Sequence, residues 1–147
     1  MEQWHTIPID AQVSRQAISD ALPSFQSQQV LLEASGYRVV ALPQELGEED
    51  VNCLQWTLGT DQYSSLEEVF ASSICIEPSE RRRGDYVIYS RDERFGLLSF
   101  THIAFVTEGR RLLSKLGPGG PLVEHADPYL VPIEYGTSYM VIRRSSN

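Results

Sequence analysis

Segments that favour β-strands dominate the second half of the chain, and this constrains the fold more than any other feature of the sequence. The segments are YVIYS at 86–90, FGLLSFTHIAFV at 95–106 and TSYMVIRR at 137–144. Their β-branched and aromatic side chains suit a pleated surface, and the short connections favour antiparallel pairing. Gly84 and Asp85 predict a turn before the first of these strands.

Helical patterns come earlier in the chain. Residues 14–22 predict a short helix that Ser14 caps and Pro23 ends. Residues 66–73 follow a serine that has a glutamate three positions later, which is the spacing of a capping box. Between the two, residues 36–42 favour a strand. Helices followed by a run of strands indicate an α+β fold, in which a helical layer packs on an antiparallel sheet.

Length and charge limit the class of protein. The 147 residues suit one compact domain, 1–147, with a real core. The formal charge of −8, from 12 basic and 20 acidic side chains, argues against a nucleic-acid partner. No apolar run is long enough to cross a membrane. The N-terminus has no basic start with an apolar block, which predicts a cytoplasmic protein or one exported without a cleaved signal peptide.

The chain has two cysteines, Cys53 and Cys75, and three widely separated histidines, His5, His102 and His125. This spacing lacks the clustered ligands of a metal site, so no metal is expected. Cys75 lies in a mixed segment and is expected to be structural.

Cys53 has the surroundings of a candidate nucleophile. Val51, Leu54 and Leu58 recur at helical spacing and Gly59 provides a stop, while Asn52 can serve as the N-cap. Cys53 would then lie in the first turn, where free N–H groups and the helix dipole favour a thiolate. The same N–H groups can hold an oxyanion. Alternatively, Cys53 is a small buried core residue, and Trp56, one turn later, is a core aromatic.

A cysteine nucleophile needs a base, and His102 is the best candidate. In a strand it would share a face with Phe100 and Ala104, while Thr101, Ile103 and Phe105 face the other side. A third polar group should orient the imidazole, and the sequence offers His125, Glu124 and Ser114. The structural alternative is an ordinary buried histidine on a strand.

The order of these residues resembles the NlpC-type cysteine peptidases, compact relatives of papain. More closely, the chain resembles a poorly characterised bacterial domain family of papain-like layout over residues 36 to 144, leaving 1–35 as an N-terminal extension. The shared pattern is N-C-x-x-W, T-H, S-K-L-G, an isolated H, and Y-G before a final strand. In this chain the pieces are Asn52, Cys53 and Trp56; Thr101 and His102; Ser114 to Gly117; His125; and Tyr135 with Gly136.

The resemblance implies a papain-like α+β fold, in which an N-terminal helical layer carries the cysteine and packs on an antiparallel sheet. It implies that Cys53 attacks an amide carbonyl, that His102 is the base, and that His125 or Ser114 holds the imidazole. Tyr37 could supply a hydroxyl near the oxyanion. Lys115 could bind a substrate carboxylate or cap the edge of the sheet.

The expected function is thiol-dependent hydrolysis of amide bonds, as a peptidase, amidase or deamidase, on a peptide, a small amide or a protein. No cofactor is expected, because thiol acyl chemistry needs none. Acyl transfer to an amine would use the same residues. The alternative is a papain-like binding module without activity, acting as the partner of a toxin, an effector or a phage component.

Overall fold

The computed structural model describes residues 4–21, 33–34, 36–41, 65–116 and 121–144. Eight strands form one sheet in the order β1-β8-β4-β5-β6-β7-β2, and β3 pairs with β8 beside this path. The strands are β1 (His5–Thr6), β2 (Arg38–Ala41), β3 (Ser73–Ile76), β4 (Tyr86–Ser90), β5 (Phe100–Val106), β6 (Leu112–Lys115), β7 (Leu122–His125) and β8 (Ser138–Arg144). The described pairings are all antiparallel, and the fold class is α+β, as predicted.

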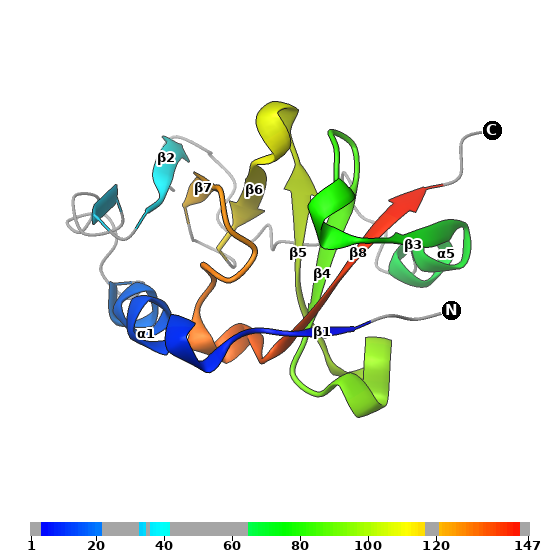
Figure 1. Ribbon diagram of the computed structural model, residues 1–147, viewed down its shortest axis with the longest axis horizontal. Helices are drawn as coiled ribbons and strands as arrows, with labels where there is room; N and C mark the ends of the chain where they lie inside the picture. Colours follow the sequence, from blue (N-terminus) through cyan, green and yellow to red (C-terminus); the bar gives the residue numbers. More distant parts are fainter. Residues whose placement is uncertain (1–3, 22–32, 35, 42–64, 117–120, 145–147) are drawn as a thin grey trace.

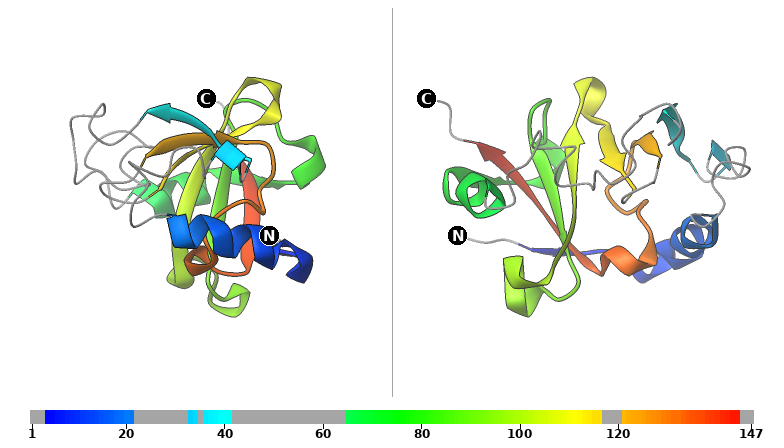
Figure 2. Two further views of the ribbon diagram at one scale, coloured as in Figure 1. Left: turned by 90° about the vertical axis from the view of Figure 1, so that its left-hand side faces the viewer. Right: turned by 180° about the vertical axis from the view of Figure 1, so that it is seen from behind.

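Among the described residues, two α-helices lie at opposite ends of the sheet (Figures 1 and 2). They are α1 (Gln12–Ala21) and α5 (Ser65–Ala71). Short 3₁₀-helices fill the connections: η1 (Ile9–Ala11), η3 (Pro78–Glu80), η4 (Glu93–Ser99), η5 (Glu108–Arg110) and η6 (Ile133–Tyr135). The helix predicted between Asn52 and Gly59 lies outside the described residues.

The central strands β4, β5 and β8 are buried on both faces, which explains their nearly continuous apolar sequences. One face carries Ile88, Ile103 and Met140 and packs against Val69 of α5. We call this group the α5-side cluster. The opposite face carries Val87, Ala104 and Val141. A further cluster lies toward β7 and α1 and includes Ile18 and Val123. The sheet therefore separates two apolar layers.

Strand β5 is shorter than predicted and contains an irregularity. Residues 95–99 belong to η4 rather than to a strand, because the chain turns at Gly96, whose φ is 53°. Tyr89 pairs with His102, but the next residue, Ser90, pairs with Phe100, so the register shifts there. The prediction that Phe100 shares a face with His102 is therefore wrong: Phe100 packs in the α5-side cluster.

The N-terminal segment is built into the fold. Strand β1 pairs with the start of β8, and α1 buries Arg15 and Ile18. Helix α1 begins two residues earlier than predicted and continues from η1, so Ser14 lies inside it and is not its N-cap. The predicted stop at Pro23 lies outside the described residues.

The other local predictions hold with shifted ends. The strand predicted at 36–42 is β2 at Arg38–Ala41, and the helix predicted at 66–73 is α5 at Ser65–Ala71. The turn at Gly84 and Asp85 is present. The carboxylate of Asp85 is buried and accepts two hydrogen bonds from Arg143, at 2.9 and 3.0 Å. Strands β1, β3, β6 and β7 were not predicted, and β3 contains Cys75.

Gly136, between η6 and β8, is needed for steric reasons. Its φ of 96° and ψ of −166° lie in a region that only glycine adopts readily. A Cβ there would meet the carbonyl oxygen of Ser90 at 2.4 Å and the Cα of Arg91 at 2.5 Å. The added Cβ would clash with backbone atoms, so no side-chain movement can relieve the clash.

We expect Gly136→Ala to destabilise the protein strongly, by about 3 kcal/mol or more, because strain and a backbone clash add. Gly109→Ala is the matched control, since Gly109 also has a positive φ, 76°, but has open space around its Cβ position. The control should cost only about 1–2 kcal/mol. Urea unfolding of both variants measures the difference, and equal losses would contradict the steric explanation.

Candidate functional site

Three adjacent strands bring two predicted histidines and a serine into one hydrogen-bonded row. His102 on β5, Ser114 on β6 and His125 on β7 are all fully buried. His102 Nε2 lies 3.1 Å from Ser114 Oγ, and Ser114 Oγ lies 2.9 Å from His125 Nε2. His125 Nδ1 lies 2.9 Å from the carbonyl oxygen of Asp127. We call His102, Ser114 and His125 the histidine–serine relay.

The last bond of the relay determines where every proton lies. A carbonyl oxygen can only accept, so His125 Nδ1 carries a proton and donates it to Asp127. In the neutral ring Nε2 of His125 is then an acceptor, and Ser114 must donate to it. The single proton of Ser114 is used, so His102 Nε2 must donate to Ser114. The proton of neutral His102 is therefore on Nε2, and its Nδ1 carries a lone pair.

Burial keeps both imidazoles neutral. Desolvation, together with the nearby His125, lowers the pKa of His102 to about 3. Desolvation also lowers the pKa of His125 to about 4, although its bond to the Asp127 carbonyl opposes the change. Both rings are therefore in their basic form at neutral pH.

Aromatic rings hold His102 in place. The ring of Tyr135 stacks on it, with centroids 4.3 Å apart and an angle of 17° between planes. The Tyr89 ring lies on β4 opposite His102 at 5.5 Å. Thr101 donates a hydrogen bond of 2.5 Å to the Tyr135 carbonyl, so Tyr135 is held at its backbone as well as through its ring. The imidazole therefore has little freedom to rotate.

The Nδ1 atom of His102 is buried and has no hydrogen-bond partner within the described part of the chain. An unpaired buried polar atom costs about 1–3 kcal/mol, so each instance calls for an explanation. Here the atom is the lone-pair nitrogen of a neutral imidazole. It can accept a proton, and this is the chemical capacity that the site offers.

Three of the predicted site residues, Asn52, Cys53 and Trp56, lie outside the described residues. Two of the three candidates for orienting His102 lie in series: Ser114 contacts it directly and His125 contacts Ser114. Glu124 is not part of the relay, since its carboxylate binds Arg38 and Arg111 at 3.2 and 2.8 Å.

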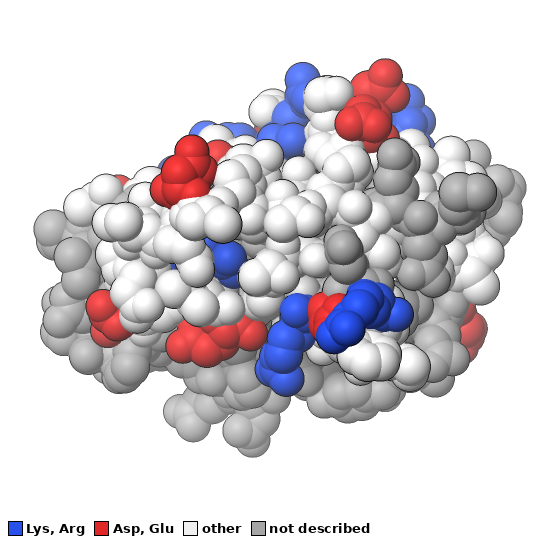
Figure 3. Space-filling model, turned by 60° about the horizontal axis from the view of Figure 1, so that its bottom comes forward, with Lys and Arg blue, Asp and Glu red and all other residues white. Residues whose placement is uncertain are grey.

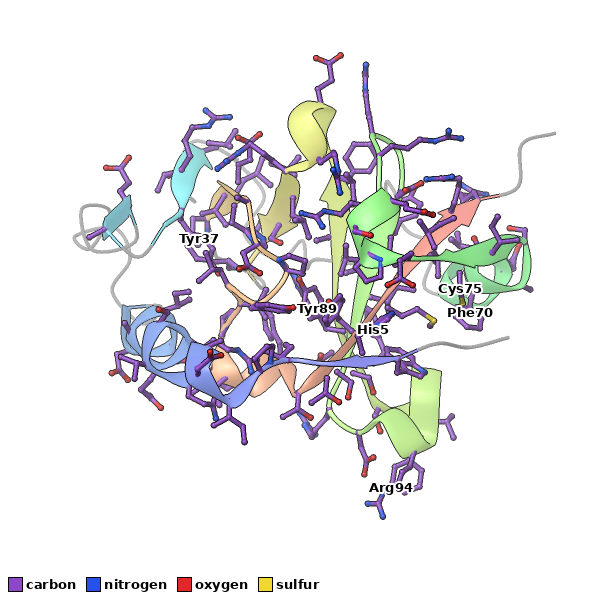
Figure 4. All side chains as sticks on the ribbon, viewed as in Figure 1. His5, Tyr37, Phe70, Cys75, Tyr89 and Arg94 are labelled. Carbon is purple, nitrogen blue, oxygen red and sulfur yellow. The ribbon has the colours of Figure 1, made fainter. Side chains whose placement is uncertain are left out.

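Two expectations about the surroundings need correction. The Tyr37 hydroxyl donates to the Leu130 carbonyl, and its ring meets that of His125 edge-on at 5.3 Å (Tyr37 and Tyr89 are labelled in Figure 4). Tyr37 therefore supports the relay instead of presenting a hydroxyl to an oxyanion. Lys115 does not cap an edge, because β6 lies between β5 and β7, and its side chain is 1% exposed, away from a soluble carboxylate.

Cys75 lies on β3 and is partly buried, with its sulfur 3.4 Å from that of Met140. It packs in the α5-side cluster, on the face of the sheet opposite the relay, as expected of a structural cysteine. Figure 4 shows it beside Phe70 of α5.

Sequence reasoning missed two contributors to the site. Asp127 acts through its backbone carbonyl, and because every residue has one, the residue type gives no signal for this role. Arg15 is buried and donates to the carbonyls of Val131, Pro132 and Gly136, at 2.9, 3.0 and 2.6 Å, which holds the segment that carries Tyr135. The only signal for Arg15 was a cation three positions before Ile18, on the apolar side of a helix.

Comparison with known proteins found no match among family models, curated proteins or solved structures. The chemistry of the site is therefore inferred from its own geometry. In the described ranges no three His, Cys, Asp or Glu side chains are grouped as metal ligands. No helix among these residues is long and apolar enough to cross a membrane. On the face drawn in Figure 3, the basic side chains that are described form small groups, some beside acidic ones, instead of a continuous area.

The lowered histidine pKa values predict a loss of stability in mild acid. The unfolded state binds protons below pH 6.5, whereas folded His102 and His125 stay neutral down to about 3 and 4. Stability therefore falls as the pH drops below 6.5 and continues to fall until the folded pKa values are reached. Urea unfolding between pH 6.5 and 5, where ordinary carboxylates remain largely ionised, should show a falling midpoint. His102→Gln should be less stable at pH 7 but flatter over this range, and an unchanged slope would contradict the assignment.

The deduced proton positions can be measured directly. We expect ¹⁵N NMR of the imidazoles at pH 7 to show an unprotonated Nδ1 in His102 and an unprotonated Nε2 in His125. Ser114→Ala should change both rings and cost about 1–3 kcal/mol, because it leaves a buried donor and a buried acceptor unpaired. Ser72→Ala, which removes a hydroxyl that donates to the carbonyls of Glu68 and Val69 in α5, is the control and should leave both signals in place. The opposite tautomer in either ring would refute the relay.

Proposed function

We propose that the protein is a thiol-dependent hydrolase of amide bonds with a papain-like, NlpC-type arrangement, in which Cys53 is the nucleophile and His102 the base. The observation that carries this proposal is the unpaired, lone-pair-bearing Nδ1 of His102, presented by a relay that fixes its tautomer. A catalytic base needs an imidazole that is neutral, oriented and open at one nitrogen. His102 meets all three requirements.

Several pieces of the family-like pattern meet around this ring. Thr101, Ser114, His125 and Tyr135 each contact His102 or a residue bonded to it. Gly136, which follows Tyr135, passes against the backbone of Ser90 and Arg91. Residues up to 34 positions apart in the chain thus serve one imidazole. This convergence supports a selected site over an isolated core histidine.

The proposed reaction uses Nδ1 of His102 first as a base and then as an acid. The Cys53 thiol gives its proton to Nδ1 of His102, and the thiolate attacks the amide carbonyl to form a tetrahedral adduct. The imidazolium then returns the proton to the departing amine, and a thioester remains. Water, deprotonated by the same nitrogen, cleaves the thioester and releases the acid. Each cycle consumes one water and leaves the cysteine and the histidine unchanged.

The relay stabilises the charge that His102 acquires in this cycle. An imidazolium formed at His102 donates from Nε2 to Ser114, which is backed by His125 and the Asp127 carbonyl. Because burial lowers the pKa of His102 to about 3, the charge is stable only beside the thiolate or the oxyanion.

The second candidate is a binding module that keeps the frame without the chemistry, as partner of a toxin, an effector or a phage component. The observation that favours it is the complete burial of the His102 ring. His102 lines neither the cavity beside His5 and Arg81 nor the one beside Thr6 and Arg94. A purely structural relay would stabilise the sheet in the same way, so activity of the thiol decides between the two.

The test is alkylation of Cys53 with an iodoacetamide probe in a Cys75→Ser background, where Cys53 is the only thiol. Removing Cys75 leaves the relay unaltered because Cys75 lies on the other face of the sheet. We expect Cys53 to react at pH 6–7 about tenfold or more faster than a free thiol, and His102→Gln to remove this advantage.

Cys53→Ala is the control that identifies the labelled site by mass spectrometry. Phe100→Leu is the matched control for His102, because Phe100 lies on β5 but packs on the opposite face. A Cys53 that reacts like a free thiol with a pKa near about 8.5, in both the parent and the His102→Gln variant, would favour the binding module.

A further inference from the structure

A cavity of about 640 Å³ lies on the far side of residues 126–129 from His125. Its walls are His5, Glu77, Pro78, Ser79, Arg81, Ala126, Asp127, Pro128, Tyr129 and Tyr139. Small-molecule sites typically measure about 300–1,000 Å³, so the volume suits an occupant the size of an amino acid or a dipeptide. None of these described wall residues belongs to the relay.

One wall is aromatic and contains an unpaired nitrogen. His5 and Tyr139 are opposite each other on β1 and β8, with ring centroids 5.5 Å apart, and Tyr129 meets Tyr139 edge-on at 5.9 Å. The Nε2 atom of His5 is buried and lacks a hydrogen-bond partner in the described part of the chain. Figure 4 shows His5 on β1 close to β8. His5 lines the cavity, and a buried polar atom without a partner is an unused hydrogen-bonding capacity.

A second wall carries a fixed cation. The Arg81 guanidinium donates to the carbonyls of Pro78, Arg110 and Ala126, at 2.9, 3.2 and 3.0 Å. Three of its five N–H groups are used, and none of the described carboxylates forms an ion pair with it. A partly buried charge held only by neutral carbonyls is a preorganised site for a carboxylate.

Two carboxylates lie in the same cavity. Asp127 accepts the backbone N–H of Tyr129 at 2.9 Å through one oxygen, which leaves the second oxygen available. Glu77 is exposed at the rim. A simple anion would be repelled by these groups and a simple cation by Arg81. A molecule with both charges and an apolar body satisfies the charges and the aromatic wall together.

We propose that this cavity is a binding site for a small zwitterion, an amino acid or dipeptide with free amino and carboxylate groups. Arg81 binds the carboxylate, Asp127 binds the ammonium, and the rings of His5, Tyr129 and Tyr139 hold the apolar side chain. The site stands apart from the proposed hydrolase and does not require it.

The experiment uses NMR of the histidine rings in the full chain, which has only three histidines. L-Phenylalanine and L-alanyl-L-phenylalanine are titrated, and N-acetyl-L-phenylalanine amide and guanosine are the uncharged comparisons. We expect at least one of the zwitterions to shift the His5 signals in a saturable way. We expect at least tenfold weaker binding of the blocked amide and of guanosine. No His5 shift with either zwitterion, or equal affinity for an uncharged compound, would overturn the proposal.

Asp127→Asn tests the charge, because the amide oxygen can still accept from Tyr129 N–H and preserve the turn. It should weaken binding about tenfold, the difference between a charged and a neutral hydrogen bond. Asp92→Asn is the matched control, since Asp92 also accepts a backbone N–H two residues later but lines the other cavity. His5→Phe keeps the ring and removes the nitrogen, and should also weaken binding. Unchanged affinity in Asp127→Asn would overturn the assignment, and Cys53→Ala should bind normally whether or not the protein is a hydrolase.

Discussion

The hydrogen bond from His125 Nδ1 to the carbonyl of Asp127 is the constraint on which the rest of the site depends. A carbonyl cannot donate, so this one contact determines the tautomer of His125, the direction of the Ser114 hydroxyl and the tautomer of His102. A serine between two imidazoles would otherwise allow two opposite arrangements. The fixed arrangement leaves the lone pair of His102 at Nδ1, which is the atom without a partner in the described residues.

The segment between β7 and β8 supports this arrangement although most of it is irregular. It has few sheet partners of its own, so its carbonyl groups are satisfied mainly by side chains from elsewhere. Tyr89 from β4 donates to Pro128 at 2.7 Å, and Tyr37 donates to Leu130. Arg15 of α1 donates to three further carbonyls, and Thr101 of β5 donates to that of Tyr135. Because these donors come from four separated parts of the chain, the conformation of this segment depends on contacts with the sheet and with α1.

This segment also connects the two proposed sites. Its first residues form the wall between the relay and the cavity beside His5, with the Asp127 carbonyl bonded to His125 and Asp127 itself lining the cavity. Arg81 contacts the Ala126 carbonyl from the cavity side. Residues 126–129 therefore contribute to both places, through the Asp127 carbonyl at His125 and through side chains at the cavity.

Local patterns in the sequence were sufficient to predict the α+β class, the strands at 86–90 and 137–144, and the turn at Gly84, because these depend on neighbouring residues. They failed at the start of β5, where Gly96 and a register shift move Phe100 to the other face. They also misjudged Lys115, because burial of β6 depends on strands that pair with it from either side.

By itself, the sequence determined which residue types were available to the site: His102 on a predicted strand, with Ser114 and His125 on later segments. The strands that carry Ser114 and His125, β6 and β7, were not predicted. Only the tertiary structure decided that these three side chains form one row, which of the candidates contacts His102, and where each proton lies. The physical reason is that strand order places β5, β6 and β7 side by side, and that backbone carbonyls, which every residue type shares, complete the hydrogen bonds. Neither the strand order nor the position of a backbone carbonyl can be inferred from the types of side chain alone.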